Sequence, residues 1–303
     1  MCDFIEEYES KSASTICFLF KILDDGKYLI EGSDHSAARE TELMLKSYSE
    51  VIEKKNKLIQ REQRKVERLL FNTLPETCVN QLRDQGQTQP EKFDEVSVLF
   101  LDFVGFTTLS TKMSTDTLFR ELNDILTQFD NIIIQHRCER IKTIGDAYLA
   151  VCGMPKRISD HANLLSLAAY RMREYIQQRN QNSKYEWRCR IGIHTGEVTG
   201  GVVGRLKYIY DIFGDGVNTA SRMESNSAEM KINMSEATHN LLSNDFVIEP
   251  RGLINVKGKG EMLMFYLEDI IGNPCADLIE SEVILPHQDS LDEHFMRDYI
   301  GED

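Results

Sequence analysis

Two aspartates, Asp102 and Asp146, stand at positions where a chain can bind metal ions and phosphate. Asp102 follows the apolar run VSVLFL, which is typical of a buried strand. Asp146 lies 44 residues later, in a Gly-Asp turn between short predicted strands over 139–144 and 147–152. If these strands are neighbours, the two carboxylates converge and repel each other. A divalent cation such as Mg²⁺ or Mn²⁺ would relieve that repulsion.

The segment after Asp102 favours phosphate binding as well. Gly105 permits a tight turn, and Thr107 and Thr108 suit the start of a helix. Backbone N–H groups at such a turn can cradle phosphate. The alternative is a strand-to-helix turn in which Asp102 only accepts local amide hydrogen bonds. This segment alone does not decide between the two interpretations.

Alternating helices and strands between about residues 93 and 269 must position these aspartates. Apolar periodicity predicts helices over 115–137, 160–180, 215–225 and 233–242. It predicts strands over 96–101, 139–144, 147–152, 188–195, 198–203, 232–234, 246–256 and 263–267.

A long helix is predicted upstream, from residue 36 to about residue 70, where Pro and Gly are absent. Its apolar positions recur every seven residues, at Leu45, Ile52, Ile59 and Val66. Lys55 and Glu62 interrupt the companion seam, so the pattern predicts a coiled coil of moderate quality, most simply a parallel dimer. Such a seam suits a linker that changes register. The alternative is a single amphipathic helix lying on a globular domain.

The chain ends are less informative. Residues 1–13 are acidic and polar and are expected to be frayed, and Pro75 should break the helix before a polar linker over 86–90. The region 272–303 is expected to be a solvated tail with a short helix near 291–299. Its two histidines, His287 and His294, are expected to have no role in metal binding.

Composition narrows the function classes. The net charge of −14 over 303 residues argues against a general nucleic-acid or anionic-membrane binder. Seven scattered cysteines without a CxxC pair indicate reduced thiols in a cytosolic protein. Apolar runs stay well short of the roughly 20 residues that span a bilayer. We therefore expect a cytoplasmic protein, or the cytosolic part of a larger or membrane-attached one.

Four motifs follow one another as DFVGFT, KTIGDAY, YDIFGDGVNTASRMES and NVKGKGEM. In this order and spacing they resemble the class III nucleotidyl cyclase catalytic domain. The resemblance implies a ferredoxin-like α+β fold with a βααββαβ core. The helix and the segment LLFNTLP before it resemble the signalling helix and transducer of such proteins, and the hairpin over 15–31 resembles the end of a PAS-type sensor. The implied organisation is an N-terminal segment (1–35), a coiled-coil signalling helix (36–70), a transducer (71–92), a catalytic domain (93–270) and an acidic tail (271–303).

The resemblance also implies a reaction. In this family the ribose 3′-hydroxyl attacks the α-phosphate in line and pyrophosphate leaves. Two divalent cations, Mg²⁺ or Mn²⁺, would be held by Asp102, Asp146 and the backbone carbonyl of Phe103. The amides from Gly105 through Phe106 to Thr107 would contact phosphate.

Further site residues follow from the same resemblance. Asn218 would orient the ribose, and Arg222, four residues later on the same helix face, would stabilise charge on the α-phosphate. Lys257 would pair with the β- and γ-phosphates. The alternative for Lys257 is an ordinary exposed lysine in a hairpin turn.

Lys142 and Asp211 bear on the base. A lysine that donates to adenine N1 and a carboxylate that accepts from the adenine amino group are complementary to ATP, whereas guanine presents the reverse pattern. Ile212 is counted with them among the substrate-binding residues. Guanylyl cyclases of this family carry glutamate where Lys142 stands and cysteine or a similar residue where Asp211 stands. The sequence therefore predicts an adenylyl cyclase, with a guanylyl cyclase or a non-catalytic cyclase-like regulatory module as alternatives.

In the family the metal-binding carboxylates and the base-binding residues face each other across a dimer interface. Because this chain contains both halves, we predict a head-to-tail homodimer with two equivalent sites. The upstream helix would bring the partners together and transmit a signal from an upstream sensor or receptor domain.

Overall fold

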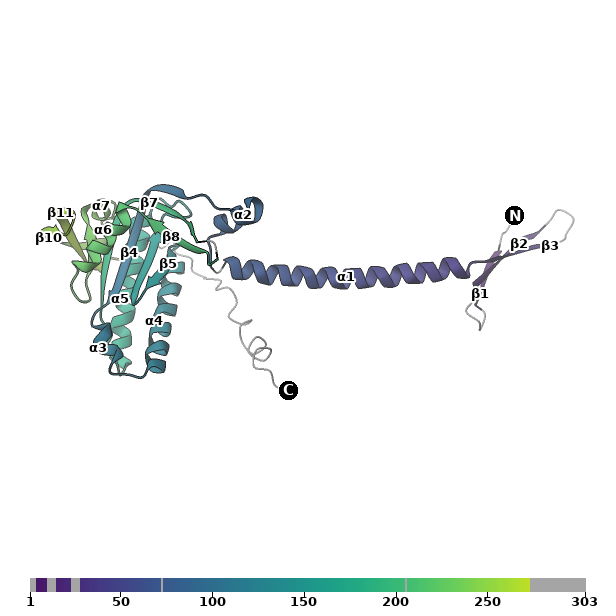
Figure 1. Ribbon diagram of the computed structural model, residues 1–303, viewed down its shortest axis with the longest axis horizontal. Coiled ribbons are helices and arrows are strands. Elements are labelled where there is room, and N and C mark those ends of the chain that lie inside the picture. The colour runs from purple at the N-terminus through teal and green to yellow at the C-terminus, as the bar shows by residue number, and fades with distance from the viewer. Residues whose placement is uncertain (1–3, 10–14, 23–27, 72, 205, 273–303) are drawn as a thin grey trace. The chain divides into compact units, whose positions relative to one another are not determined.

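The computed structural model describes residues 4–9, 15–22, 28–71, 73–204 and 206–272. The chain divides into two compact units, Met1–Asn72 and Thr73–Asp303 (Figure 1). The turn of the hairpin expected over 15–31 and the expected tail from residue 273 on, with its helix and both histidines, lie outside the described residues. In the part of the chain that is described, none of the helices combines the length and apolar character needed to cross a membrane.

The first unit contains an antiparallel sheet in the order β1-β2-β3. Its strands are β1 (Phe4–Glu9), β2 (Thr15–Ile22) and β3 (Tyr28–Asp34). The expectation that the first 13 residues are frayed is wrong for β1, because all six of its residues pair with β2. This edge strand was not recognised in the sequence because acidic residues, which are frequent in it, are uncommon in strands.

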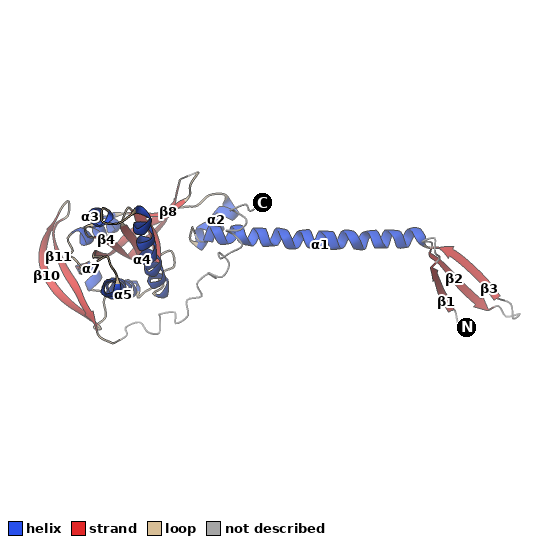
Figure 2. Cartoon of the chain, turned by 90° about the horizontal axis from the view of Figure 1, so that it is seen from below, coloured by secondary structure: helices blue, strands red, loops and turns tan. Residues whose placement is uncertain are grey.

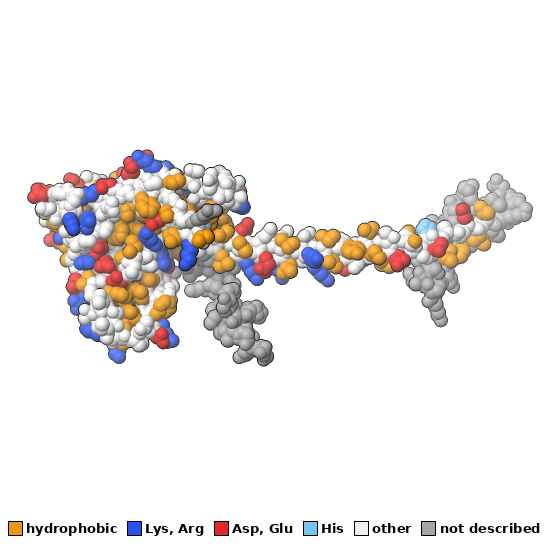
Figure 3. Space-filling view, viewed as in Figure 1, with side chains coloured by type: hydrophobic (Ala, Val, Ile, Leu, Met, Phe, Trp, Pro, Cys, Tyr) orange, Lys and Arg blue, Asp and Glu red, His pale blue; other side chains and the backbone are white. Residues whose placement is uncertain are grey.

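The long helix is confirmed as α1 (Ser36–Phe71). Asp34 Oδ1 accepts a hydrogen bond of 2.8 Å from the N–H of Ser36 and so caps the start of the helix. The heptad positions are exposed in the single chain by 54–64 % of their surface: Leu45, Ile52, Ile59 and Val66. Figure 3 shows apolar side chains exposed along α1. A helix with this seam uncovered has apolar surface available for a partner.

The second unit begins with α2 and is built around one sheet. Its helices are α2 (Glu76–Gln85), α3 (Phe106–Ser110), α4 (Thr115–Gln135), α5 (His161–Asn182), α6 (Asp215–Ser225) and α7 (Glu236–His239). Its strands are β4 (Glu91–Phe103), β5 (Glu139–Ile144), β6 (Ala147–Cys152), β7 (Cys189–Val203), β8 (Ile209–Phe213), β9 (Ile232–Ser235), β10 (Phe246–Val256) and β11 (Gly260–Ile270). The mixed α+β fold expected from the motifs is confirmed.

The sheet runs in the order β10-β11-β9-β7-β4-β6-β5, and β8 pairs with β7. The neighbours pair antiparallel except β7 and β9, which are parallel. The two strands expected over 188–195 and 198–203 are one continuous strand, β7, because both halves pair with β4. The helix expected over 233–242 is only the short α7, since β9 uses the first of those residues to pair with β11.

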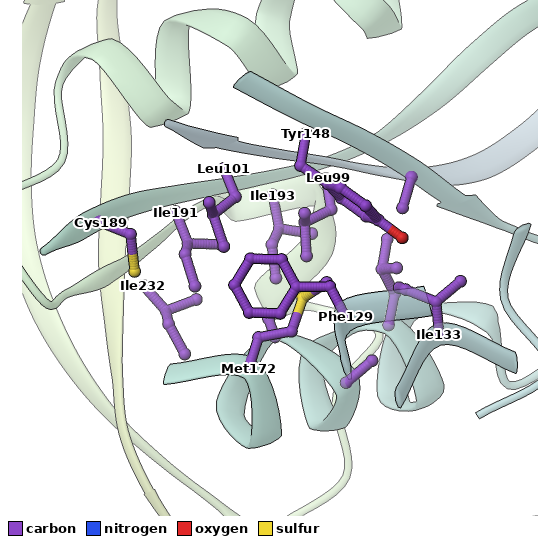
Figure 4. Packing of buried hydrophobic residues seen from close by; sticks show 14 of the residues in the cluster. Leu99, Leu101, Phe129, Ile133, Tyr148, Met172, Cys189, Ile191, Ile193 and Ile232 are labelled. Atoms are coloured by element: carbon purple, nitrogen blue, oxygen red, sulfur yellow. The ribbon is translucent and has the colours of Figure 1, made fainter. Parts of the chain in front are cut away.

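Strand β4 is buried on both faces, and this places its end in the middle of the domain. Alternate residues of β4 pack toward α4 and α5 on one face and toward α2 and α6 on the other. Figure 2 shows α4 and α5 together beside the sheet, and Figure 4 shows Leu99, Leu101 and Phe129 meeting in the first layer. The apolar run before Asp102 is therefore a central strand, as predicted.

Candidate active site

Asp102 and Asp146 come together at one end of the neighbouring inner strands β4 and β6. Strands β4 and β6 are paired as far as Leu101 opposite Tyr148, so Asp102 lies one residue beyond the last pair and Asp146 lies in the turn that precedes β6. Burial raises the pKa of the Asp146 carboxyl above its ordinary value, and the negative charge of Asp102 raises it further. The predicted convergence of the two carboxylates therefore has an electrostatic signature in the structure.

This pair fits a divalent cation. Two carboxylates that disfavour each other's charge gain from a cation between them. Groups of three or more acidic, cysteine or histidine side chains able to hold a metal are absent from the described residues. The remaining ligands would have to be backbone, water or phosphate oxygens, as Mg²⁺ prefers in nucleotide sites.

Phe103 can contribute only through its backbone. Its ring is buried, stacks on Phe129 with a centroid distance of 6.3 Å and meets the edge of Trp187 at 5.0 Å. These contacts hold the end of β4 in place beside Asp102.

The turn after β4 has the conformation that phosphate binding requires. Gly105 has φ of 69°, the left-handed region that glycine adopts without strain, and precedes α3. Phe106 packs toward Trp187 at 6.3 Å between ring centroids, which turns its side chain inward. The backbone N–H groups of Phe106 and Thr107 lie in the first helical turn, where an α-helix has no internal acceptors.

Lys142 and Asp211 form an ion pair between β5 and β8. The Lys142 Nζ lies 2.5 Å from Asp211 Oδ2, and the side chains are 33 % and 14 % exposed. Asp211 Oδ1 also accepts a hydrogen bond of 2.9 Å from the N–H of Ile212, which fixes the carboxylate. The Ile212 side chain is buried in the core. Only its backbone can therefore reach a substrate.

Asn218 and Arg222 lie on α6, which rests directly on β7. A Cβ built on Gly192 would lie 1.9 Å from the backbone N of Glu224, so only glycine permits this contact. Asn218 is exposed and Arg222 half-buried. Within the described residues, neither side chain has a hydrogen bond or ion pair with another residue. Both are therefore available to a ligand.

A further charged group was missed in the sequence. Arg190 on β7 lies opposite Asp102 on β4, and its Nη2 donates to Asp102 Oδ2 at 3.0 Å. Its Nε lies 3.0 Å from Glu224 Oε1. The signal was available, because Arg190 lies near the start of the strand predicted over 188–195 and Glu224 is the only acid inside ASRMES. Only the register of β4 against β7 brings them to Asp102.

The basic turn between β10 and β11 contains two lysines with different surroundings. Lys257, the predicted phosphate ligand, is exposed, whereas Lys259 pairs with Asp215 at the start of α6. Of these two lysines, only Lys257 was predicted from the sequence to contact phosphate. Strand β8, which carries Asp211, was also missed, although the alternating YIYDIF is typical of a strand.

The site residues therefore form two groups. Asp102, Asp146 and the turn after β4 form one, and the Lys142–Asp211 pair with Asn218 and Arg222 forms the other. Among the described residues, hydrogen bonds and ion pairs do not join a named member of one group to a named member of the other. The first group fits a divalent cation, and the second offers hydrogen-bond donors and acceptors to a ligand.

This fold and this pair of groups define a nucleotide-processing α+β domain, and comparison with known proteins gives its family. Residues 88–269 match the family described as the adenylate and guanylate cyclase catalytic domain. The chain belongs to this family.

Relatives of both substrate types are found. An adenylate cyclase of Mycobacterium tuberculosis is 39 % identical over 202 residues, which is 66 % of this chain and 46 % of that protein. A receptor-type guanylate cyclase of Caenorhabditis elegans is 36 % identical over 212 residues, 68 % of this chain and 16 % of that protein. The chain thus spans less than half the length of these relatives.

A solved structure is similar as well. The catalytic core of a rhodopsin-guanylyl cyclase with converted specificity, in complex with ATPαS, is 37 % identical with a TM-score of 0.56, over 59 % of this chain and 98 % of that one. The catalytic domain is thus that of a nucleotide cyclase, and its relatives include enzymes named for either nucleotide.

Proposed function

We propose that this protein is an adenylyl cyclase that converts ATP to 3′,5′-cyclic AMP and pyrophosphate. The observation that carries the choice of base is the Lys142–Asp211 ion pair, with 2.5 Å between Nζ and Oδ2. A cation and a carboxylate side by side offer one donor and one acceptor to the edge of a purine.

The pair is complementary to adenine. Lys142 would donate to N1, and Asp211 would accept from the exocyclic amino group. Guanine has an N1–H donor and an O6 acceptor at these positions, so each would meet a group of its own kind. Unpaired buried polar groups cost about 1–3 kcal/mol each, which is a tenfold or greater preference for ATP.

The relatives support this reading in part. The mycobacterial relative is named an adenylate cyclase. The rhodopsin-guanylyl cyclase core with converted specificity is in complex with ATPαS. The nematode relative, a guanylate cyclase, favours the alternative that this chain uses GTP.

The remaining site residues would each act on a different part of the triphosphate or the ribose. Divalent cations bound by Asp102 and Asp146 would offset phosphate charge and lower the pKa of the attacking hydroxyl. The amides of Gly105, Phe106 and Thr107 and the Lys257 ammonium would hold the phosphate chain. Asn218 would orient the ribose, and Arg222 would stabilise the charge that develops on the α-phosphate.

We also propose a head-to-tail homodimer in which each site takes Asp102 and Asp146 from one chain and the base-binding group from the other. Apolar side chains exposed by 47–98 % cluster on and beside the β7–β8 hairpin of a single chain: Val203, Leu206, Tyr208, Ile209 and Phe213. A cluster of this kind, of which Figure 3 shows one view, is typical of a protein interface. The α1 seam would add a coiled-coil contact, carrying signals from an upstream sensor in the cytosol.

The base assignment is tested by comparing ATP and GTP turnover with Mn²⁺. ATP is expected to be preferred at least tenfold, and the double variant Lys142→Glu with Asp211→Cys should move the preference toward GTP. Preferential use of GTP by the unaltered protein would overturn the assignment. Unchanged activity of Asp102→Asn would instead point to a mechanism without the proposed metal ligands.

The composite site is tested by complementation. Asp102→Asn and Asn218→Ala should each be inactive alone, because each removes one group from both sites. In a mixed dimer, one site combines the intact Asp102 of one chain with the intact Asn218 of the other. Mixing the two variants should therefore restore a share of the activity, and no restoration would contradict the shared site.

A further inference from the structure

Four buried hydroxyl groups connect His161 to His194 through a continuous series of hydrogen bonds, which we call the hydroxyl chain. His161 begins α5 and His194 lies on β7. The hydroxyls belong, in order from His161 to His194, to Ser97, Thr195, Thr238 and Ser235. Successive atoms, from the Nδ1 of one imidazole to the Nδ1 of the other, are 2.7 to 3.4 Å apart. In the described part of the protein, these hydroxyls have no acceptor outside the hydroxyl chain.

The number of hydrogens in the hydroxyl chain makes the two histidines depend on each other. Five hydrogen bonds need five hydrogens, and each of the four hydroxyls supplies one. The fifth can come only from the Nδ1 of one imidazole, and every hydroxyl then points toward the other imidazole. Burial lowers the pKa of both histidines, so each is neutral at neutral pH and carries one ring proton. One histidine therefore has its proton on Nδ1, and the other has its proton on Nε2.

The surroundings of His194 favour a proton on its Nδ1. A Cβ built on Gly196 would lie 2.9 Å from the His194 Nε2 and 3.7 Å from the Cα of Gly216, so Nε2 faces the first turn of α6. The N–H groups of that turn carry positive partial charge. Beyond burial, the Lys259 ammonium lowers the pKa of His194 further, and this outweighs the opposite effect of Asp215. A lone pair on Nε2 is therefore better placed there than an N–H.

The surroundings of His161 favour the complementary form. Glu95 and Asp160 oppose the lowering of its pKa by burial, so their negative charges stabilise a proton on the ring. Because Nδ1 is turned to Ser97, Nε2 is the nitrogen that points a hydrogen outside the hydroxyl chain. Both ends thus favour the same direction, in which His194 donates into the hydroxyl chain and His161 accepts from it.

We propose that the hydroxyl chain makes His194 a positioning residue for α6, by holding its proton on Nδ1 and a lone pair on Nε2. The lone pair faces the donors at the start of α6, whereas an Nε2–H would turn a hydrogen toward them. The part of the inference that concerns activity rests on the proposed function, because α6 carries Asn218 and Arg222. Since the hydroxyls can reverse together, the protonated nitrogen of His194 depends on groups that His194 does not touch.

Thr195→Val tests this by cutting the hydroxyl chain in its middle with a side chain of the same size. The Thr238 hydroxyl loses its acceptor in this variant. It regains one by donating to Ser235, whose hydroxyl then donates to the Nδ1 of His194. The proton of His194 must therefore move to Nε2, because a buried hydroxyl without an acceptor is costly. His161 still accepts from Ser97 and should not change.

Nitrogen-15 NMR of the whole protein, labelled in histidine and measured at pH 7.5, reports which nitrogen of each ring carries the proton. His161→Asn and His194→Asn assign the two rings, because each variant loses one set of signals. The unaltered protein should show Nδ1–H at His194 and Nε2–H at His161. In Thr195→Val, His194 should change to Nε2–H while His161 stays as it was.

The matched control is Thr127→Val. The Thr127 hydroxyl donates to the Asn123 carbonyl oxygen at 2.7 Å within α4, outside the hydroxyl chain. This control should leave both rings and the kcat for the preferred nucleotide unchanged. Thr195→Val should lower that kcat by about tenfold, because a small displacement of catalytic groups on α6 is costly.

A second variant applies if Thr195→Val does not fold, as judged by its melting temperature. Ser97→Ala leaves the Thr195 hydroxyl without an acceptor and should move the proton of His194 to Nε2 in the same way. Nε2–H at His194 in the unaltered protein would overturn the proposal, as would an Nδ1–H that persists in the variant that folds. A moved proton with unchanged kcat would overturn the positioning of α6.

These failures are distinguishable from a failure of the proposed function. The NMR measurement uses no nucleotide, so it reports on the hydroxyl chain whichever nucleotide the protein prefers. Preferential use of GTP, or failed complementation between Asp102→Asn and Asn218→Ala, would contradict the adenylyl cyclase assignment or the shared site and leave the NMR result standing.

Discussion

Lys142 and Asp211 neutralise each other within one chain, whereas Asp102 and Asp146 do not. The lysine and aspartate lie 2.5 Å apart and are ready-made as a donor and acceptor. The two aspartates instead oppose each other's charge, and the pKa of the Asp146 carboxyl is raised by burial and by Asp102. One region is assembled by the fold. In the other, the fold places Arg190 beside Asp102, and a bound cation would offset the repulsion that remains between the two aspartates.

Because of this difference, the two regions should respond differently to substitutions and to the removal of cations. Removing the cation or a carboxylate of the Asp102–Asp146 region should abolish cyclase activity and change the free energy of unfolding little. Removing either member of the Lys142–Asp211 pair should weaken recognition of the base and lower the free energy of unfolding. The predictions below follow this contrast, from the largest effect to the smallest.

Asp102→Asn should lower kcat by about 1,000-fold, because a cation that stabilises charge in the transition state contributes several kcal/mol. Chelation of divalent cations should have the same effect on the unaltered protein. Steady-state cyclic-nucleotide formation measures both. The free energy of unfolding should stay within about 1 kcal/mol of the unaltered value, because the loss of the partly exposed ion pair with Arg190 is offset by removal of the repulsion with Asp146. A large loss of stability would contradict the contrast.

Lys142→Met should lower kcat/KM for ATP by about 100-fold, because it removes a donor to the base and leaves Asp211 buried without its partner. The free energy of unfolding should also fall, unlike that of Asp102→Asn. Urea unfolding of the two variants side by side measures this. Similar stability losses in both would show that the two regions do not differ as described.

His194 on β7 should make the stability of the domain depend on pH. Its Nδ1 lies 2.7 Å from Ser235 Oγ, and burial, assisted by the charge of Lys259, lowers its pKa to about 4. The unfolded chain, with a histidine pKa near 6.5, binds more protons in this range, so stability is present above pH 6.5 and is lost as the pH falls toward 4.

Between pH 7.5 and 5 the unaltered protein should lose about 2 kcal/mol from this group. His194→Asn, which keeps a polar group near Ser235, should lack that part of the dependence. Burial also lowers the pKa of His136 and His161, so the difference between variant and unaltered protein isolates His194. Parallel pH profiles of urea midpoints would show that His194 does not contribute.

The smallest effects are expected at the two lysines of the β10–β11 turn. Lys257→Ala should raise KM for the nucleotide by about 3- to 10-fold and leave the melting temperature unchanged, because an exposed phosphate contact is partly screened. Lys259→Ala should do the reverse, costing up to about 1 kcal/mol of stability through its pair with Asp215. Kinetics and melting curves together separate the roles, and the opposite pattern would exchange them.

Much of the fold was predictable from local pattern. The hairpin around Asp146 has the predicted strand bounds, 139–144 and 147–152, and α6 spans 215–225 as expected. Strand β8 and the continuity of β7 were not recognised, because edge pairing and strand length depend on neighbours far away in the sequence. The short α7 had a helical pattern over 233–242, but pairing of β9 with β11 took its first residues.

By itself, the sequence determined the residue types and their order: two aspartates at turns, the lysine and aspartate that we propose bind the purine base, and Asn218 and Arg222 one helical turn apart. It determined them because strand and helix periods are local properties of a chain. Only the tertiary structure brought Lys142 onto Asp211 across 69 positions, and Arg190 between Asp102 and Glu224. Those contacts depend on strand register and on the glycine at position 192, which has no side chain to hold α6 away.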